Sequence, residues 1–248
     1  MMRPDLLSRR PGLVVLVDPS RVDAGQAERV GREAAGAGVA GLLIGSSFDG
    51  SGSTQAIAAA LRRGAPGVPL ALFPGSAMQL TDQVDLVLLL SLVSGRNPQY
   101  LIEEHVRAVP FFQRSPVPVL STAYILIDGG RVTSVEAVSQ TRPLPRDKPE
   151  LAAAHAIAGR MIGMGAVYLD AGSGAECPVA PAVIRACREA VQDVPLFVGG
   201  GIRTPEAAAA AARAGADFVV IGTVVERDAG RQQALEQFVR AVAGEGGR

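Results

Sequence analysis

The sequence has few of the side chains that carry common catalytic chemistries. Lys148 is the only lysine among 248 residues, and it falls in a loop-like segment rather than at the end of an expected strand. A Schiff-base mechanism therefore has no candidate nucleophile. The two histidines, His105 and His155, fall within expected helices, and the sequence contains neither a Ser-His-Asp set nor a histidine-rich zinc motif. These absences exclude several classes of hydrolase and aldolase.

Cysteines, net charge and long apolar runs are also scarce. Cys177 and Cys187 fit neither a disulfide framework nor a C-x-x-C pair, so we expect a cytoplasmic protein. The 24 basic residues balance 24 acidic ones, which leaves no basic field to hold a nucleic acid. The longest apolar stretch, Leu86–Val93, is far shorter than the roughly 20 residues that cross a bilayer. We therefore expect no nucleic-acid partner and at most peripheral membrane contact.

Short apolar runs recur along the whole chain. They are continuous and rich in Val, Ile and Leu, which is typical of strands buried on both faces of a parallel sheet. The runs are Leu13–Val17, Gly41–Gly45, Leu70–Phe73, Leu86–Leu90, Val117–Ile127, Ala166–Leu169, Leu196–Val198 and Phe218–Ile221. Most are separated by helical patterns, at about 31 residues per unit. We expect a single α/β domain over residues 1–248, a (β/α)8 TIM barrel, with an open doubly wound sheet as the alternative.

Local signals mark where several of the helices begin and where the pattern fails. Asp23 followed by Gln26 is a capping-box pattern, and Thr204 precedes a proline at a first helical position. The segment Ser76–Gln83 is too short for a full helix, which predicts an irregular or missing third helix. The segment Ile127–Val132 predicts a hairpin, because Asp-Gly-Gly at its centre is a turn sequence.

Glycines and hydroxyls follow the expected strands, at the end of a barrel where active sites form. The clusters are Gly45-Ser46-Ser47, Phe73-Pro74-Gly75-Ser76, Ala171-Gly172-Ser173-Gly174, Gly199-Gly200-Gly201 and Gly222-Thr223. Glycine lets backbone N–H groups approach an oxyanion closely, and the last two clusters follow the seventh and eighth strands, where barrels hold phosphate. Tight turns alone are the other interpretation, and we favour phosphate binding.

Two acidic residues end expected strands. Asp18 ends the first and Asp170 the sixth, where a carboxylate could ligate Mg²⁺ or act as a general base. For Asp18, which precedes Pro19, a turn or cap residue is the other interpretation. Strand alternation places Tyr168 and Asp170 on one side, which in a barrel is the lumen. Apolar and aromatic residues gather around the third to fifth strands, where they could form core or a groove for a hydrocarbon tail.

These motifs together resemble those of the geranylgeranylglyceryl phosphate synthases and the related heptaprenylglyceryl phosphate synthases. The segment Tyr168–Ala175 is similar to their Y-L-E-A-G-S-G-A signature. Further matches are Val17-Asp18-Pro19, Gly45-Ser46-Ser47, Leu72-Phe73-Pro74-Gly75, Ser91-Leu92, Ser94-Gly95-Arg96-Asn97-Pro98, Ala123-Tyr124-Ile125-Leu126, Gly199-Gly200-Gly201-Ile202-Arg203 and Gly215-Ala216-Asp217. The resemblance covers nearly the whole chain in the same order.

The resemblance implies a Mg²⁺-dependent prenyltransferase. It would join a prenyl diphosphate, for which we expect geranylgeranyl diphosphate, to the sn-3 hydroxyl of sn-glycerol 1-phosphate, giving an ether-lipid precursor. The implied Mg²⁺ ligands are Asp18 and Ser47, and Asp170 and Tyr168 are the catalytic candidates. The implied substrate-binding residues are Tyr168, Leu169, Asp170, Ala171, Gly172, Ser173, Gly174, Gly200, Gly201, Gly222 and Thr223.

Some residues depart from the family pattern. The signature acid is often Glu, so Asp170 is one methylene shorter. Thr223 stands where Asn is common, and Ser46 replaces a second glycine. A sugar-phosphate isomerase and a non-catalytic ligand-binding barrel remain the alternatives. Tyr100 is our candidate for a stop that limits prenyl length, with a core tyrosine as the other interpretation. The resemblance also implies a homo-oligomer.

Overall fold

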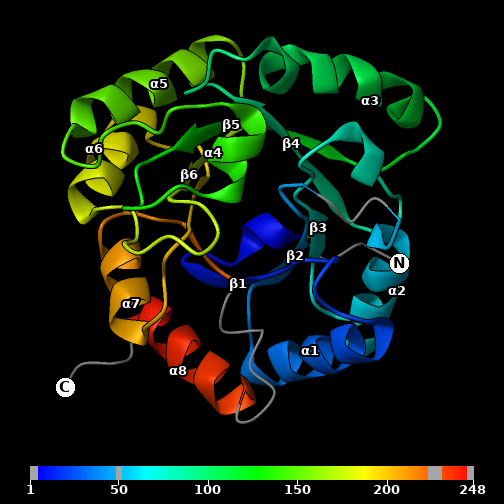
Figure 1. The fold of residues 1–248 in the computed structure, drawn as a ribbon. Coiled ribbons are helices and arrows are strands. Elements are labelled where there is room, and N and C mark those ends of the chain that lie inside the picture. The colour runs from blue at the N-terminus through cyan, green and yellow to red at the C-terminus, as the bar shows by residue number, and fades with distance from the viewer. Residues whose placement is uncertain (1–4, 49–51, 223–230, 245–248) are drawn as a thin grey trace.

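The polypeptide forms a closed barrel of eight parallel strands surrounded by helices (Figure 1). The computed structural model describes residues 5–48, 52–222 and 231–244. Consecutive strands are neighbours throughout, and the last strand pairs with the first, Gly12 opposite Phe218 and Val15 opposite Ile221. The expected (β/α)8 barrel is therefore confirmed, and the open sheet is excluded.

The described elements alternate along the chain. The strands are β1 (Gly12–Val17), β2 (Gly41–Ile44), β3 (Leu70–Leu72), β4 (Leu86–Leu92), β5 (Val119–Leu126), β6 (Ala166–Asp170), β7 (Leu196–Gly199) and β8 (Phe218–Ile221). The α-helices are α1 (Ala24–Ala37), α2 (Thr54–Gly64), α3 (Glu104–Phe112), α4 (Ser134–Ser139), α5 (Pro149–Met161), α6 (Pro181–Val191), α7 (Pro205–Arg213) and α8 (Arg231–Ala243). The 3-10 helices η1 (Leu6–Ser8) and η2 (Ala77–Gln79) and the π-helix η3 (Gln99–Glu103) complete the set.

The strands are continuous apolar runs because both of their faces are buried. One set of side chains fills the lumen, including Leu43, Leu88 and Phe197, and the other set packs between the barrel and the helices. Aromatic rings stack through the lumen, with Phe197 4.6 Å from Phe218 and 5.9 Å from Tyr168 between ring centroids. Burial of this apolar surface is the main term that stabilises the fold.

The helix-capping signals are confirmed. Asp23 Oδ1 accepts a hydrogen bond of 2.8 Å from the Gln26 backbone N–H, and Gln26 Oε1 accepts one of 2.9 Å from Asp23 N–H. Thr204 Oγ1 accepts from Ala207 N–H at 3.2 Å. Each such cap stabilises its helix by about 1 kcal/mol, which fixes where the chain leaves the strand-end loop.

The helix that would connect β3 to β4, the third of a regular barrel, is missing, as expected. After β3 the chain forms only η2, a single 3-10 turn of three residues. The Gln79 side chain fixes this segment, because its Oε1 accepts from Gly75 N–H at 3.0 Å and its Nε2 donates to the Ser46 carbonyl at 2.9 Å. One side of the barrel mouth is therefore bordered by a short segment instead of a helix.

The hairpin expected at Ile127–Val132 is wrong. Ile127 forms a parallel bridge with Leu144, and Gly129 instead packs against the loop after β6. A Cβ atom on Gly129 would lie 2.6 Å from the Ala171 carbonyl oxygen, so glycine serves close backbone packing at this position. The turn-like sequence was misleading because glycine is required both in turns and where two backbones meet.

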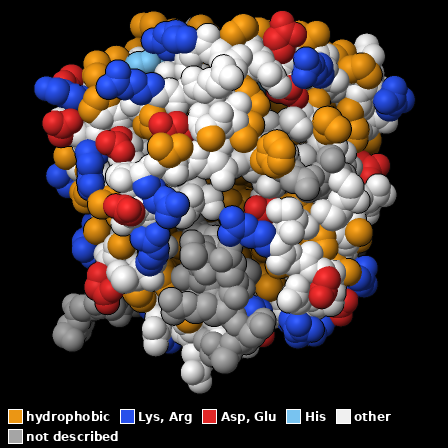
Figure 2. All heavy atoms as spheres, viewed as in Figure 1, with side chains coloured by type: hydrophobic (Ala, Val, Ile, Leu, Met, Phe, Trp, Pro, Cys, Tyr) orange, Lys and Arg blue, Asp and Glu red, His pale blue; other side chains and the backbone are white. Residues whose placement is uncertain are grey.

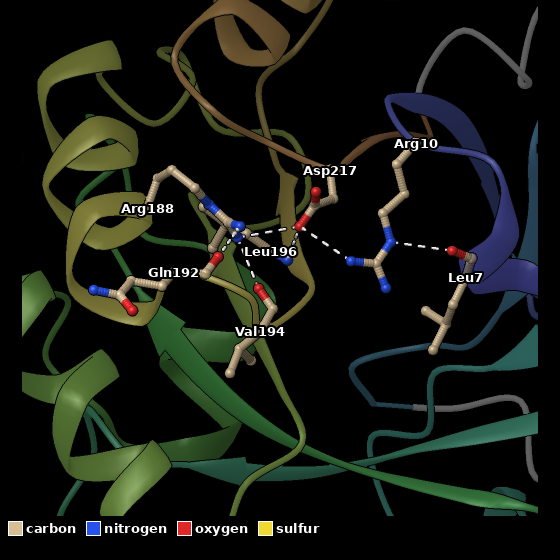
Figure 3. A network of polar contacts seen from close by, with 7 residues as sticks. All are labelled: Leu7, Arg10, Arg188, Gln192, Val194, Leu196 and Asp217. Atoms are coloured by element: carbon tan, nitrogen blue, oxygen red, sulfur yellow. Dashed lines mark hydrogen bonds and ion pairs between the residues drawn. The ribbon is translucent and has the colours of Figure 1, made fainter.

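The amino-terminal end of the barrel is closed by the segment before β1. Leu6, in η1, packs against the lumen residues at this end of the strands. A polar network holds this end together (Figure 3): Asp217 Oδ2 accepts from Leu196 N–H at 2.8 Å and pairs with Arg188 Nη2 at 3.1 Å, and Arg10 Nη1 lies 4.0 Å away. Structural contacts fill this end, so a site is expected at the opposite end, where the carboxyl ends of the strands lie.

No helix within the described ranges combines the length and apolar character needed to cross a membrane. Positive, negative and apolar side chains are interspersed over the face that Figure 2 shows.

Candidate active site

The main pocket lies at the carboxyl ends of the strands. From β6 through β8 and β1 to β2, the lining residues are largely polar or glycine: Asp18, Ser46, Ser47, Tyr168, Asp170, Ser173, Gly174, Gly200, Gly201 and Gly222. On the remaining side the lining is mostly apolar, with Glu104, His105 and Ser139 among the apolar residues Leu80, Leu89, Leu90, Leu92, Tyr100, Ala108, Val135 and Val138. The pocket therefore consists of a polar half, which is suited to bind an anion, and an apolar half.

Asp170 ends β6 and is the buried carboxylate of the polar half, with a relative exposure of 8%. Its Oδ1 accepts a hydrogen bond of 2.8 Å from Gly172 N–H, and its Oδ2 accepts one of 2.5 Å from the hydroxyl of Tyr124 on β5. Burial raises the pKa of Asp170 above its usual value, while these two hydrogen bonds lower it. A carboxylate with a raised pKa in a pocket is suited to accept a proton.

Tyr168 lies two residues before Asp170 and faces the same side, as alternation predicts. Its ring centroid is 4.6 Å from that of Phe73 and 5.7 Å from that of Tyr124. Burial, followed by the charge of Asp170, raises the pKa of Tyr168 well above its usual value, so the phenol stays neutral. These rings form an aromatic floor beside the carboxylate.

The loops after β6 and β7 have backbone conformations that require glycine. Gly172, Gly174, Gly200 and Gly201 have φ angles of 87°, 76°, 80° and 70°. Arg203 ties the two loops together, because its guanidinium donates to the carbonyls of Gly174 and Glu176 at 3.3 and 3.2 Å. Loops of this kind expose N–H groups without side chains, which suits a bound phosphate.

The carboxylate of Asp18 lies across the polar half, at the end of β1. Its Oδ1 accepts from the Ser20 backbone N–H at 2.9 Å and from the Ser20 hydroxyl at 2.7 Å. Its Oδ2 lies 3.4 Å from the Ser46 hydroxyl and 3.5 Å from Arg21 Nε. Ser47 lines the same pocket. The side-chain atoms here that could ligate a metal ion belong to one carboxylate and several hydroxyls, so all of them are oxygens.

The apolar half is built by β4, η3, α3 and α4. Tyr100 lies in the π-helix, half-buried, and its neighbour Glu104 binds Ala77 N–H in η2 at 2.7 Å. His105 also lines the pocket, where its Nε2 lies 2.8 Å from the Leu90 carbonyl oxygen. Phe111 and Phe112 pack against each other at 5.3 Å and belong to the outer core rather than to this wall.

Most of the sequence-predicted site residues come together in this pocket. Those that line it are Asp18, Ser47, Tyr100, Tyr168, Asp170, Ser173, Gly174, Gly200, Gly201 and Gly222. The side chain of Leu169 instead points into the layer between barrel and helices, as strand alternation requires. Ala171 and Gly172 lie behind the lining, where Gly172 reaches the pocket only through its bond to Asp170. Thr223 lies outside the described residues.

Two pocket residues, Tyr124 and Ser46, and one residue behind the pocket, Gln79, have contacts that the sequence did not predict. Tyr124 was named in a family match and among the aromatic residues, but without a role, although its hydroxyl donates to Asp170. Ser46 was placed in the strand-end cluster and described as a glycine replacement, but the contact of its hydroxyl with Asp18 was not predicted. Gln79 fixes the segment that replaces the third helix. The strand-end position of Ser46 was the available signal; the other two depend on contacts across the barrel.

Comparison with known proteins agrees with this geometry. The PcrB family model matches residues 5–242. A geranylgeranylglyceryl phosphate synthase of Spirosoma linguale is 41% identical over 240 residues, 97% of this chain and 96% of that protein. One of Methanothrix thermoacetophila is 38% identical over 229 residues, 92% of this chain and 89% of that protein.

A solved structure supports the same assignment. The crystal structure of (S)-3-O-geranylgeranylglyceryl phosphate synthase from Thermoplasma acidophilum, in complex with the substrate sn-glycerol-1-phosphate, matches with a TM-score of 0.90. The identity is 30%, over 98% of this chain and 99% of that one. Together these similarities show that the chain belongs to the PcrB family and is a prenyltransferase of the geranylgeranylglyceryl phosphate synthase type.

Proposed function

We propose that the protein transfers a geranylgeranyl group from its diphosphate to the sn-3 hydroxyl of sn-glycerol 1-phosphate, using Mg²⁺. The observation that carries the proposal is the junction of two unlike halves in one pocket, with Asp170 and Tyr168 at the polar side of it. A small phosphorylated alcohol and a long hydrocarbon donor need these two environments side by side. Family membership sets aside the isomerase and the non-catalytic binding barrel.

The acceptor is assigned to the loops after β6, β7 and β8. Its phosphate would lie on the N–H groups of Gly200, Gly201 and Gly222, and its glycerol part would lie along Tyr168, Asp170 and Ser173. Backbone amides at Gly200 and Gly201 are open to an anion because these residues carry no side chain. This placement directs the acceptor hydroxyls toward Asp170.

The reaction then needs one bond made and one broken. The acceptor oxygen forms a bond to C1 of the prenyl chain while the bond from C1 to the diphosphate oxygen breaks, and the hydroxyl proton passes to Asp170. Burial suits Asp170 to this step, since its pKa is raised. The neighbouring aromatic faces of Tyr168 and Phe73 favour positive charge at C1 through their quadrupoles.

The donor set around Asp18 fits Mg²⁺. Mg²⁺ prefers oxygen, keeps several waters and is often held by one or two carboxylates plus substrate phosphates. Asp18 and Ser47 would hold it, with Ser46 beside them. When bound, the ion neutralises charge on the departing diphosphate. Within the described ranges no group of three or more His, Cys, Asp or Glu side chains forms a metal cluster, so waters and substrate phosphate oxygens would supply the other ligands.

The prenyl chain is assigned to the apolar half, which passes between β4, η3, α3 and α4. Tyr100 stands in this wall and is our candidate for the stop that favours the geranylgeranyl length over longer donors. A π-helical turn at this point fits a functional position, because such turns concentrate at functional sites. The homo-oligomer implied by the resemblance stays a prediction.

The direct test is incubation of the protein with geranylgeranyl diphosphate, labelled sn-glycerol 1-phosphate and Mg²⁺, followed by organic extraction. We expect an extractable labelled lipid and a metal requirement. Labelled sn-glycerol 3-phosphate is the stereochemical control. The proposal is overturned if no donor, from geranyl to heptaprenyl diphosphate, gives labelled lipid.

A further inference from the structure

The hydroxyl of Tyr124 and the carboxylate of Asp170 form a buried pair that joins two neighbouring strands. Tyr124 lies on β5 with 5% of its surface exposed, and its hydroxyl donates to Asp170 Oδ2 at 2.5 Å. Burial, together with the adjacent carboxylate, raises the pKa of Tyr124 well above its usual value. The phenol therefore stays protonated and is the donor in this hydrogen bond.

The two hydrogen bonds on Asp170 fix the plane of its carboxylate. Gly172 N–H holds Oδ1 at 2.8 Å from one side, and the phenol holds Oδ2 from the other. The terminal torsion of an aspartate side chain is otherwise broad and weakly restrained. Rotation about that torsion would break both bonds, so the pair keeps the carboxylate in one orientation.

We propose that Tyr124 is a positioning residue for the proton transfer, holding the Asp170 carboxylate aimed at the acceptor hydroxyl and in its ionised form. This inference rests on the proposed function. It also accounts for the departure at position 170, where this chain has Asp in place of the common Glu. A shorter side chain has less reach, so its orientation decides whether it meets the hydroxyl, and small misplacements are costly.

The ionised form of Asp170 depends on few other groups. Tyr168, from β6, is the other ionisable side chain close to it, and β7 presents only Gly199 and Gly200. The remaining ionisable side chains that line the pocket are Asp18, Arg21, Tyr100, Glu104 and His105. Within the part of the chain that the structure describes, none of these forms a hydrogen bond or ion pair with Asp170. Loss of the phenol should therefore act directly on the carboxylate.

The kinetic test compares Tyr124→Phe with the wild type across pH. The Phe variant keeps the ring and its contacts with Phe73 and Tyr168, so we expect it to fold. We expect kcat to fall by roughly 10- to 100-fold, with little change in KM for sn-glycerol 1-phosphate. Without the phenol the pKa of Asp170 rises, so the acidic limb of the profile moves to higher pH.

Thr122→Val is the matched control. Thr122 lies two residues earlier on the same strand and face and is fully buried. Among the residues that the structure describes, its hydroxyl bonds only the Leu120 carbonyl, at 3.0 Å. The Thr122→Val substitution removes a buried hydroxyl that does not contact Asp170, so we expect the acidic limb of the pH profile to stay where it is in the wild type. Replacing Tyr124 by 3-fluorotyrosine, a more acidic donor, should move the limb to lower pH.

A second measurement does not need turnover. Carbon-13 NMR of labelled aspartate side chains, with Asp170→Asn for assignment, follows the titration of this carboxyl in the protein alone. We expect the Asp170 pKa to be higher in Tyr124→Phe than in the wild type or Thr122→Val. An unchanged pKa together with an unchanged limb overturns the positioning role. If the wild type makes no lipid, the proposed function fails, while the NMR titration still decides the role of Tyr124.

Discussion

A Cβ atom on Gly200 would lie 2.5 Å from Oδ1 of Asp170 and 2.6 Å from the backbone nitrogen of Gly172. The carboxylate therefore occupies space that exists only because position 200 has no side chain. The φ angle of Gly200, 80°, adds a second reason for glycine there. Gly200 is thus required both for the conformation of the proposed phosphate-binding loop and for the space that the Asp170 carboxylate occupies.

Replacing Gly200 by Ala should displace the Asp170 carboxylate and close the loop against phosphate. We expect kcat/KM to fall by roughly 100-fold and affinity for sn-glycerol 1-phosphate to weaken, with a stability cost of about 1–3 kcal/mol. Steady-state kinetics, calorimetric binding and denaturant unfolding measure these effects. Gly163→Ala is the control: its φ is 91° but open space surrounds it, so it should cost about 1–2 kcal/mol in strain without loss of activity. Equal activity losses in the two variants would contradict the assignment.

Replacing Asp170 by Asn removes the proposed base but keeps the shape of the side chain. We expect kcat to fall by about 100-fold or more, and the acidic limb of the pH profile to disappear. Burial raises the folded-state pKa of Asp170, so the wild-type carboxyl binds a proton more tightly in the folded than in the unfolded state. Protonation of Asp170 therefore stabilises the folded state at low pH, and this stabilisation is lost as pH rises through the raised pKa.

Thermal unfolding checks the same point. The Tm of Asp170→Asn relative to the wild type should increase from acidic to neutral pH, because the amide never has to hold a buried charge. Asp128→Asn, at an exposed position, should show no such trend and keep its activity. A variant of Asp170 that retains turnover at neutral pH would rule the residue out as the base.

Replacing Asp18 by Asn tests the metal site. An amide oxygen is a weaker ligand for Mg²⁺ than a carboxylate, so the concentration of Mg²⁺ that gives half-maximal activity should rise by about tenfold or more. Titration of activity with Mg²⁺ measures this shift. Asp23→Asn makes the same chemical change five residues away, at the cap of α1, where Asn is as good as Asp. Identical Mg²⁺ dependence in the two variants would place the ion elsewhere.

Replacing Tyr100 by Ala should lengthen the chain that the apolar half accepts. With geranylgeranyl and longer diphosphates offered together, the product distribution should move toward the longer chains, as read by mass spectrometry of the extracted lipids. Ile102→Ala, two residues on and 54% exposed, is the control and should leave the distribution as in the wild type. An unmoved distribution in Tyr100→Ala would assign the residue to packing alone.

The sequence was most informative where local physics decides the outcome. The apolar runs, the capping box at Asp23 and the missing third helix all follow from short-range rules, and the structure confirms them. The strand-end position of Asp170 and its alternation with Leu169 likewise predicted which side chain faces the pocket. Local patterns thus predicted the barrel and most of its polar rim.

Contacts across strands were out of reach for the same reasoning. The bond between Tyr124 and Asp170 depends on the register of β5 against β6, where Tyr124 stands opposite Tyr168, and no sequence pattern specifies that register. The incorrect hairpin prediction at Ile127–Val132 has a similar origin, because Gly129 is required by close packing against a backbone segment that is distant in sequence. Such residues can be recognised only once the strands are placed side by side.

Leu6 and the stacked rings of Phe197 and Phe218 fill the lumen at the amino-terminal end of the barrel. In the proposed reaction, both substrates would therefore enter, and the lipid product would leave, at the carboxyl ends of the strands. For the proposed reaction, we expect release of the lipid product to limit kcat at saturating substrate, because leaving the apolar half exposes the prenyl chain to water. Added micelles, by offering that product a destination, should quicken turnover while leaving the bond-forming rate untouched.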